Sequence, residues 1–454
     1  MKKGGIMKRA LLLSILNITV LLVAYGQWTY DDLSEPKCRL GATSIGNKVY
    51  FVAGDNETQS FSEIEIYDAW TGEWDSTISL SASRSIPSCI STGTKVLVAG
   101  GFDLFSGASY SEVDIWDTET KTWDLTYMSV PRFFVSAAAK GNKVLLAGGM
   151  DPNVPTAYDV VDIYNLESGT WEIAHLSLAR AAMACAVVGD LAFFAGGFDM
   201  LTSEVTDIVD IYRFSTNTWT TDTLSLGRAF AAAVAVGSKI LIAGGAYNIN
   251  VQSDVVDIYD TATGLWTTWN LSSPRSFYPW NAASVGTSAF FVGGGATDLS
   301  QGVWTSGSDV IDSYDEFLHQ WTVENLPQPL IMHAVAGSEN KLVVGGGAAG
   351  PTWNIVSTLQ ILEVIEAMPE QREETSILRI WPNPTSGNLH LELKENTQVK
   401  NMTLSICAIQ GRKILEQTLS TGTREINLQV PDGVYVLTIR AGEMVQQELI
   451  TIRK

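Results

Sequence analysis

Residues 132–149 read RFFVSAAAKGNKVLLAGG, and this stretch contains most of the pattern that decides the fold. An arginine precedes a short run of small residues, which is followed by a Gly-Asn turn, an apolar run and a pair of glycines. The apolar run, residues 143–147, lacks polar alternation, which is typical of a strand covered on both faces. The glycines allow a kink or a close backbone approach that a Cβ would prevent. The stretch therefore predicts two neighbouring buried strands and a sharp turn.

The same pattern recurs along the chain every 46 to 52 residues. Its first landmark is the glycine pair, degenerate in its first copy, at Gly54-Asp55, Gly100-Gly101, Gly148-Gly149, Gly196-Gly197, Gly244-Gly245, Gly294-Gly295 and Gly346-Gly347. An aromatic residue follows each of the first six, at Tyr67, Trp116, Tyr164, Tyr212, Tyr259 and Tyr314. A tryptophan then closes the unit, at Trp74, Trp123, Trp171, Trp219, Trp266 and Trp321. Because the three landmarks recur in the same order and at a similar spacing, they predict repeated units. Each unit would bury its apolar sides against the next.

These landmarks resemble the kelch repeat, whose blades are four-stranded antiparallel sheets. The resemblance covers about residues 28–365 and implies an all-β fold, a kelch-type β-propeller over residues 27–365. Small residues suit the inner strands near the axis, and the large Tyr and Trp suit the wider outer gaps between blades.

The number of landmarks predicts seven blades. Seven glycine sites occur, but only six tryptophans follow them in phase, and Trp28 lies where a seventh would fall in a closed ring. We expect residues 27–31 to supply the outer strand of the last blade, which would leave no open edge. Six blades is the alternative.

The two ends of the chain carry different signals. Residues 1–26 read as a signal peptide, with four basic residues before a short apolar run and Ala24-Tyr25-Gly26 before the cut. Residues 366–376 read as a linker, and residues 377–454 alternate apolar and polar side chains as in a small antiparallel Ig-like β-sandwich. We expect no membrane-spanning segment in the mature chain, because no second apolar stretch is long enough.

The last segment resembles the C-terminal sorting domain of the type IX secretion system of Bacteroidetes. The matching positions include Pro382, Asn383, Pro384, Gly387, Gly433 and Tyr435. The resemblance implies the type IX machinery as a partner and export to the medium or the outer cell surface, released or attached to lipopolysaccharide. An ordinary Ig-like module is the alternative.

Charge and cysteine content exclude several classes of function. The formal net charge is -20, which opposes non-specific binding of nucleic acid. The cysteines are not spaced for zinc or dithiol chemistry, and free thiols are favoured over a Cys38–Cys89 bond. His175, His319 and His333 occupy different repeat positions, so we expect no metal and no cofactor.

Two groups of residues are candidates for ligand binding. Five arginines precede the inner strands at equivalent positions, where a ring could bind carboxylate or sulfate groups: Arg84, Arg132, Arg180, Arg228 and Arg275. Pairing with nearby acids is the structural alternative, and acids recur at Glu65, Asp114, Asp162, Asp210, Asp257 and Asp312. The irregular sector after Arg275 adds Tyr278, Trp280 and Trp304, which suit stacking on sugars or gripping a peptide, or packing between blades.

These features favour a secreted or cell-surface binding scaffold for a glycan or a protein, without catalytic residues. No common hydrolase, nucleotide-binding or metalloprotease motif occurs. The competing hypothesis is an extracellular carbohydrate-active enzyme, a lyase or sialic-acid isomerase on a kelch scaffold, which would gather Arg, Glu and Tyr with perturbed pKa values in the central pocket. A structural envelope component without a small ligand is a third hypothesis.

Overall fold

The computed structural model describes residues 28–452 except 155, 200–201, 203, 249, 279, 300–302, 351–352, 365–377, 382–387, 394–400, 409–412, 421–424, 432 and 442–443. The expected signal peptide and linker lie outside the described residues. Within these residues every regular element is a β-strand, and no helix is long and apolar enough to cross a membrane. The all-β prediction is therefore confirmed.

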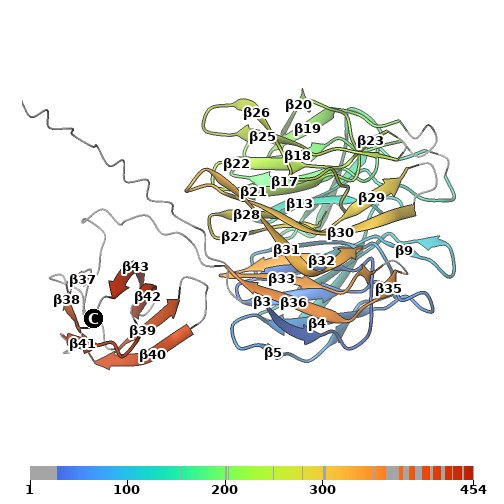
Figure 1. Cartoon of the computed structure of the whole chain (residues 1–454). Coiled ribbons are helices and arrows are strands. Elements are labelled where there is room, and N and C mark those ends of the chain that lie inside the picture. Colours follow the sequence, from blue (N-terminus) through green and yellow to red (C-terminus); the bar gives the residue numbers. More distant parts are fainter. Residues whose placement is uncertain are drawn as a thin grey trace, which may run out of the picture.

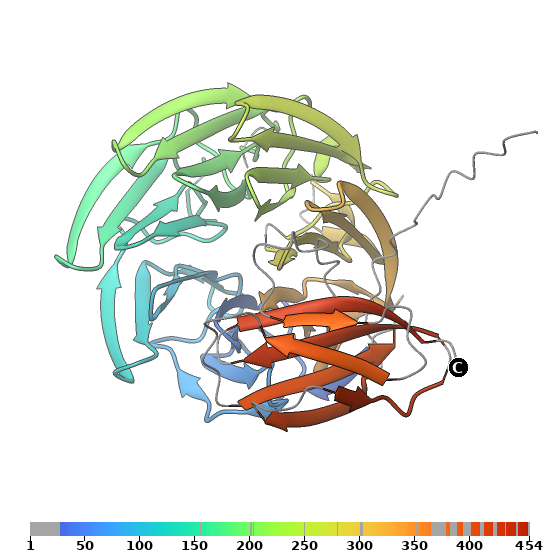
Figure 2. The same cartoon turned by 90° about the vertical axis from the view of Figure 1, so that its left-hand side faces the viewer.

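Seven antiparallel sheets, counted within the described residues, follow one another along residues 28–363 and surround a common axis (Figures 1 and 2). We number these sheets blades 1 to 7. Blade 1 contains β2 (Gly41–Ile45), β3 (Lys48–Val52), β4 (Glu63–Asp68), β5 (Glu73–Trp74) and β6 (Ile78–Ser79). Blade 2 contains β7 (Ser88–Thr92), β8 (Lys95–Ala99), β11 (Glu112–Asp117) and β12 (Thr122–Tyr127). Blade 3 contains β13 (Ser136–Lys140), β14 (Lys143–Ala147), β15 (Val160–Asn165) and β16 (Thr170–His175).

The remaining blades keep the same order from inner to outer strand. Blade 4 contains β17 (Ala184–Val188), β18 (Leu191–Ala195), β19 (Ile208–Arg213) and β20 (Thr218–Thr223). Blade 5 contains β21 (Ala232–Val236), β22 (Lys239–Ala243), β25 (Val255–Asp260) and β26 (Leu265–Asn270). Blade 6 contains β27 (Ala282–Val285), β28 (Ser288–Val292), β30 (Val303–Asp315) and β31 (Gln320–Ile331). Blade 7 contains β32 (Ala334–Ser338), β33 (Lys341–Gly345), β36 (Thr358–Glu363) and β1 (Thr29–Asp32).

The ring is closed by strands from opposite ends of the propeller sequence. Each innermost strand contacts that of the next blade, and the series returns from β32 to β2. On the outside, β1 pairs antiparallel with β36, with Thr29 opposite Ile361 and Asp32 opposite Thr358. Trp28 packs against the core between blades 6 and 7. The expected role of the N-terminal segment as the outer strand of the last blade is confirmed.

The repeat landmarks fill the spaces between blades. In six blades the aromatic residue and the closing tryptophan are direct cross-strand partners, as in Tyr164 and Trp171, whose ring centroids are 4.6 Å apart. This pair packs on Leu97 and Ala99 of blade 2, so each blade covers a face of the preceding one. Burying these large rings between sheets is the main apolar gain of the repeat.

The two ends of the ring differ in their loops. Each second strand is followed by its glycine pair, which in blade 1 is the degenerate Gly54-Asp55. Long loops come next, and they include the hairpins β9–β10 (Phe102–Asp103, Ala108–Ser109), β23–β24 (Ala246–Asn248, Val251–Gln252) and β34–β35 (Ala348–Ala349, Asn354–Ile355). In blade 6, β29 (Gly295–Asp298) pairs with β30. We call this end the diglycine face; it lies on the right in Figure 1. The opposite face carries short turns, such as the one joining β13 to β14.

The C-terminal segment forms two separate antiparallel sheets within the described residues. One contains β37 (Leu378–Trp381), β38 (Asn388–Leu393) and β41 (Glu425–Asn427). The other contains β39 (Asn401–Ala408), β40 (Lys413–Ser420), β42 (Gly433–Ala441) and β43 (Met444–Ile452). Leu389 and Ile426 from the first sheet share one buried cluster with residues of the second, including Leu404 and Leu437. The two sheets therefore bury a common apolar core.

Deleting residues 28–32 is expected to lower the thermal midpoint of unfolding and to promote association, because the backbone groups of β36 would be left as an open edge. Scanning calorimetry and gel filtration measure the two effects. Tyr30→Ser is the matched control, since Tyr30 is exposed and the substitution keeps the backbone pairing. A deletion variant as stable and as monodisperse as the control would contradict this role of β1.

Candidate functional site

The five predicted arginines lie inside the blades. Their side chains are 0–1% exposed, and each forms an ion pair with the recurring aspartate of its own third strand. Arg132 and Asp162 are typical, with 2.7 Å between Nη2 and Oδ2. The five recurring aspartates therefore act as arginine partners, as the structural alternative expected.

Each arginine also organises the connector that enters its blade. Arg180 donates from Nε to the carbonyl of Gly196 at 2.8 Å and from Nη2 to that of Phe194 at 3.1 Å. Its own carbonyl accepts a hydrogen bond from the amide of Gly149 in the preceding blade, at 3.1 Å. A Cβ on Gly148 would lie 2.4 Å from that same carbonyl, so the first glycine of the pair is needed for the approach.

The five arginines therefore do not form an exposed ring that a ligand could reach. All five guanidinium groups are enclosed, and burial lowers the pKa of Arg132, Arg180, Arg228 and Arg275 while the paired carboxylates oppose that shift. A ligand carboxylate would have to displace an internal one. The sequence period gave the position of each arginine around the ring but not the direction of its side chain.

Blades 1 and 7 depart from this pattern. In blade 1, Lys37 and Glu65 replace the pair, with 2.6 Å between Nζ and Oε1. In blade 7 the equivalent positions carry Leu330 and Gln360, which are 0% and 1% exposed. Removing the arginine together with its acid avoids leaving an uncompensated buried charge.

A cluster of apolar side chains closes the axis at the diglycine face. Phe134 and Phe230 meet edge to face at 5.4 Å, and Tyr278 lies 5.9 Å from Phe134. In blades 2 to 5 the residue two positions after the arginine adopts positive φ. Backbone hydrogen bonds link these positions from blade to blade, such as Phe230 N to Ala182 O at 3.2 Å. This strained geometry, costly for residues with a Cβ, turns the chain at the axis.

The three predicted aromatics come together within this cluster. Trp304 stacks on Tyr278, with ring centroids 5.7 Å apart and an interplanar angle of 10°. Trp280 also packs against Tyr278, with ring centroids 5.2 Å apart and an interplanar angle of 46°. Tyr278 is buried, whereas Trp280 and Trp304 are half-buried. Burial raises the pKa of the Tyr278 phenol, so this group stays neutral.

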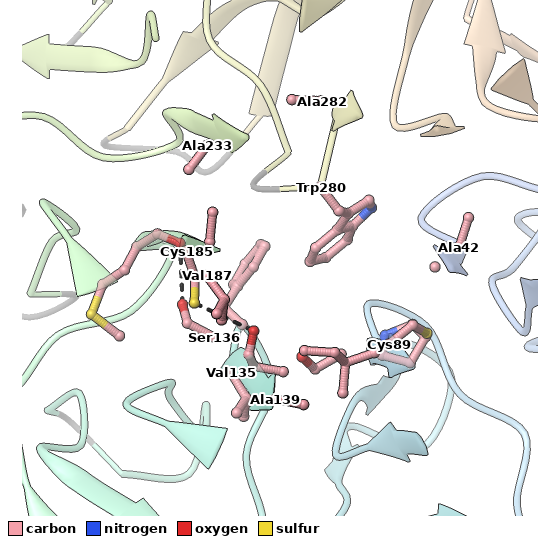
Figure 3. Close-up of a pocket in the computed structure, with 18 residues that line it drawn as sticks. Ala42, Cys89, Val135, Ser136, Ala139, Cys185, Val187, Ala233, Trp280 and Ala282 are labelled. Carbon is pink, nitrogen blue, oxygen red and sulfur yellow. Dashed lines mark hydrogen bonds between the residues drawn. The ribbon is translucent and has the colours of Figure 1, made fainter. Parts of the chain in front are cut away.

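A cavity of about 260 Å³ lies on the axis beneath this cluster. Small residues of the inner strands form its wall, and Phe134 and Trp280 belong both to it and to the axial cluster. Figure 3 shows Trp280 across the space from Ser136, Val135 and Cys185. Among the described residues, none that line the cavity carries a formal charge. The gathering of Arg, Glu and Tyr that would favour catalysis is therefore not found in this wall.

Two of the cavity's side chains are thiols. Cys89 and Cys185 occupy equivalent positions in blades 2 and 4, and all four cysteines of the chain are unbonded, including Cys38. Burial raises the pKa of Cys89 to about 12 and raises that of Cys185 as well. Protonated thiols are poor nucleophiles, so neither is prepared for covalent chemistry.

The propeller histidines lie apart. His175 and His319 are exposed, and they contact Asp159 and Tyr314 respectively. His333 is fully buried, with Nε2 3.2 Å from the carbonyl oxygen of Val292. Among the described residues no group of three or more His, Cys, Asp or Glu could hold a metal ion.

Comparison with protein families matches both parts of the chain. Residues 36–76, 84–125, 131–174 and 227–268 match the kelch motif, and residues 379–453 match the secretion system C-terminal sorting domain. This is a kelch-repeat chain with a type IX sorting domain. Blades 4, 6 and 7 lie largely outside the matched motifs yet repeat the same strand order.

More distant likenesses are weaker. A putative F-box/kelch-repeat protein of Arabidopsis thaliana is 24% identical over 106 residues, which are 23% of this chain and 36% of that protein. The chain thus spans about a third of the length of this curated relative. The solved structure of YjhT is similar with a TM-score of 0.48 and 15% identity, over 74% of this chain and 97% of that one.

The sorting domain indicates type IX export to the medium or the cell surface, and the type IX machinery as a partner. Among the residues expected to form the C-terminal sorting signal, Pro382, Asn383, Pro384 and Gly387 lie outside the described residues. Gly433 begins β42, and the Tyr435 hydroxyl donates to the carbonyl of Pro431 at 2.8 Å.

Sequence reasoning missed the pair formed by Arg39 and Asp55 at the axis. Asp55 stands where the other blades carry the second glycine, and Arg39 stands where they carry axial apolar residues such as Phe134. Arg39 donates to Asp55 from both Nε and Nη2. The degenerate Gly54-Asp55 copy was the available signal, since an acid at a glycine position needs a cationic partner nearby.

Substituting Arg180→Met is expected to destabilise folding by about 3–5 kcal/mol, because Asp210 would remain buried without its partner. Asp210→Leu should do the same, and the double variant should recover much of the loss. Urea unfolding of the four proteins as a double-mutant cycle measures the coupling. Additive losses would show that the two side chains do not act as a pair.

Acid should destabilise the propeller through His333. Burial lowers its pKa from 6.5 to about 4, so the folded state excludes a proton that the unfolded chain binds below pH 6.5. The free energy of unfolding is therefore unaffected by His333 above pH 6.5. It falls by about 3 kcal/mol as the pH is lowered from 6.5 to 4, because the unfolded chain is stabilised by binding the proton. His333→Met should flatten the dependence measured by urea unfolding between pH 7.5 and 4.5, whereas the exposed His175→Gln control should not.

Proposed function

We propose that this chain is a secreted or cell-surface binding scaffold whose diglycine face holds a glycan or a protein. Its support is the aromatic cluster of Tyr278, Trp280 and Trp304 on the axis of that face. Irregular hairpins surround the cluster, and binding residues are commonly found on loops that a rigid scaffold positions. Half-buried tryptophans offer flat apolar area at low entropic cost, which suits both sugar rings and peptide side chains.

The internal pairing of the ionisable groups favours a binding role over a catalytic one. The arginines of blades 2 to 6 are paired internally, and the cavity wall holds neutral side chains and protonated thiols. A lyase or an isomerase would need a base or acid with a shifted pKa facing the substrate. Burial raises the pKa of Glu324 to about 7, but Glu324 lies on the outer strand β31, away from the axis.

The test is a glycan array and a pull-down from culture medium, both with the full chain. We expect these screens to identify a partner. Its affinity for the Trp304→Ala variant should be at least tenfold lower, because the substitution removes one well-packed aromatic contact. Trp269→Ala is the matched control, because Trp269 is an exposed tryptophan on the outer strand β26. Absence of a partner in both screens, together with depolymerising or isomerising activity on polysaccharides, would overturn the proposal.

A further inference from the structure

The cations of the propeller are divided unequally between its two faces. Residues 28–363 contain fifteen lysines and arginines, of which seven lie at the diglycine end: Lys37, Arg39, Arg84, Arg132, Arg180, Arg228 and Arg275. Six of these are 0–2% exposed, and the side chain of Arg39 is 20% exposed. All seven form ion pairs with carboxylates.

The other eight cations lie toward the opposite face: Lys48, Lys95, Lys121, Lys140, Lys143, Arg213, Lys239 and Lys341. They stand in or beside its short turns, where all are at least partly exposed. The diglycine face thus presents almost no positive charge to solvent.

Acidic residues are exposed on the diglycine face. Glu57, Glu204 and Asp207 lie on its loops with exposed side chains, and no ion pair joins them to a cation within the described residues. Asp103 and Asp254 add partly exposed carboxylates on neighbouring loops. A surface of one sign attracts partners of the other sign and repels its own.

The same face exposes apolar side chains at its hairpin tips. Leu104 and Phe105 are 43% and 52% exposed on the β9–β10 hairpin, and Tyr247 and Val251 are 40% and 38% exposed on the β23–β24 hairpin. Between these hairpins lies the axial aromatic cluster, in which Trp304 is half-buried. Exposed apolar groups among charges of a single sign are typical of a protein docking surface.

We propose that the diglycine face docks a basic polypeptide, in which Lys or Arg side chains alternate with aliphatic or aromatic ones. This inference rests on the proposed binding function and selects the partner within it. Anionic glycans are disfavoured, because the face offers them no accessible guanidinium or ammonium group except the partly covered Arg39. Apolar side chains of the partner contact the hairpin tips and the axial cluster, and its cations lie against the surrounding carboxylates.

The test uses a labelled twelve-residue peptide of alternating Lys and Leu with one Trp, and the full chain. Glu57→Lys, Glu204→Lys and Asp207→Lys together should weaken binding at least tenfold. The matched control is Glu73→Lys, Glu119→Lys and Glu167→Lys, three exposed acids in or beside turns of the opposite face, which change the net charge equally. It should change the affinity less than twofold.

A second pair of variants tests the apolar contribution. Phe105→Ser with Tyr247→Ser should weaken peptide binding, whereas Leu125→Ser with Ile173→Ser, exposed positions on outer strands, should not. Equal losses in the two charge-reversal variants, no binding of the peptide, or preference for its Glu-for-Lys counterpart would overturn the inference.

The two proposals fail differently. A glycan that binds in the array and depends on Trp304, with no binding of the basic peptide, would retain the scaffold function and reject the basic partner. Enzymatic activity on polysaccharides without any bound partner would reject both.

Discussion

The buried pair of an arginine and an aspartate is the interaction on which the rest of this propeller depends. In blades 2 to 6 it fixes the connector that enters the blade to the third strand of that blade, as Arg180 does with Asp210. The fixed connector then presents the arginine's carbonyl to the glycine pair of the preceding blade. Because burying two charges is costly, such a pair is tolerated only where further hydrogen bonds satisfy the remaining donors, as the carbonyls of Phe194 and Gly196 do here.

Much of the fold could be predicted from the sequence, because a ring of similar units repeats its constraints. The glycine pair, the aromatic residue and the tryptophan each have one place in the blade, and Trp28 indicated where the ring closes. The candidate site was harder to predict. The spacing of 16 residues between Arg132 and Gly148 reflects a hydrogen bond from that side chain to the glycine carbonyl, not a shared exposed surface. Periodicity gives the angle around the axis, whereas burial depends on side-chain direction and on partners distant in the sequence.

Departures from the repeat come in compensating sets. Arg39 and Asp55 replace an axial apolar residue and a glycine together, and Leu330 and Gln360 replace a charged pair together. The aromatic cluster is a looser case of such joint replacement. Tyr278, Trp280 and Trp304 come from an irregular sector, and the repeat does not predict where their side chains lie. That these three side chains contact one another could be learned only from the path of the chain in the structure.

The pairing of β1 with β36 has a consequence for the order in which the molecule is built. Thr29 emerges from the ribosome more than 300 residues before its partner Ile361, so the first strand has no neighbour during most of synthesis. The sorting domain follows β36 in the chain. Because the sorting domain is synthesised after the last blade, the export machinery cannot recognise it on a nascent chain that still lacks part of the propeller.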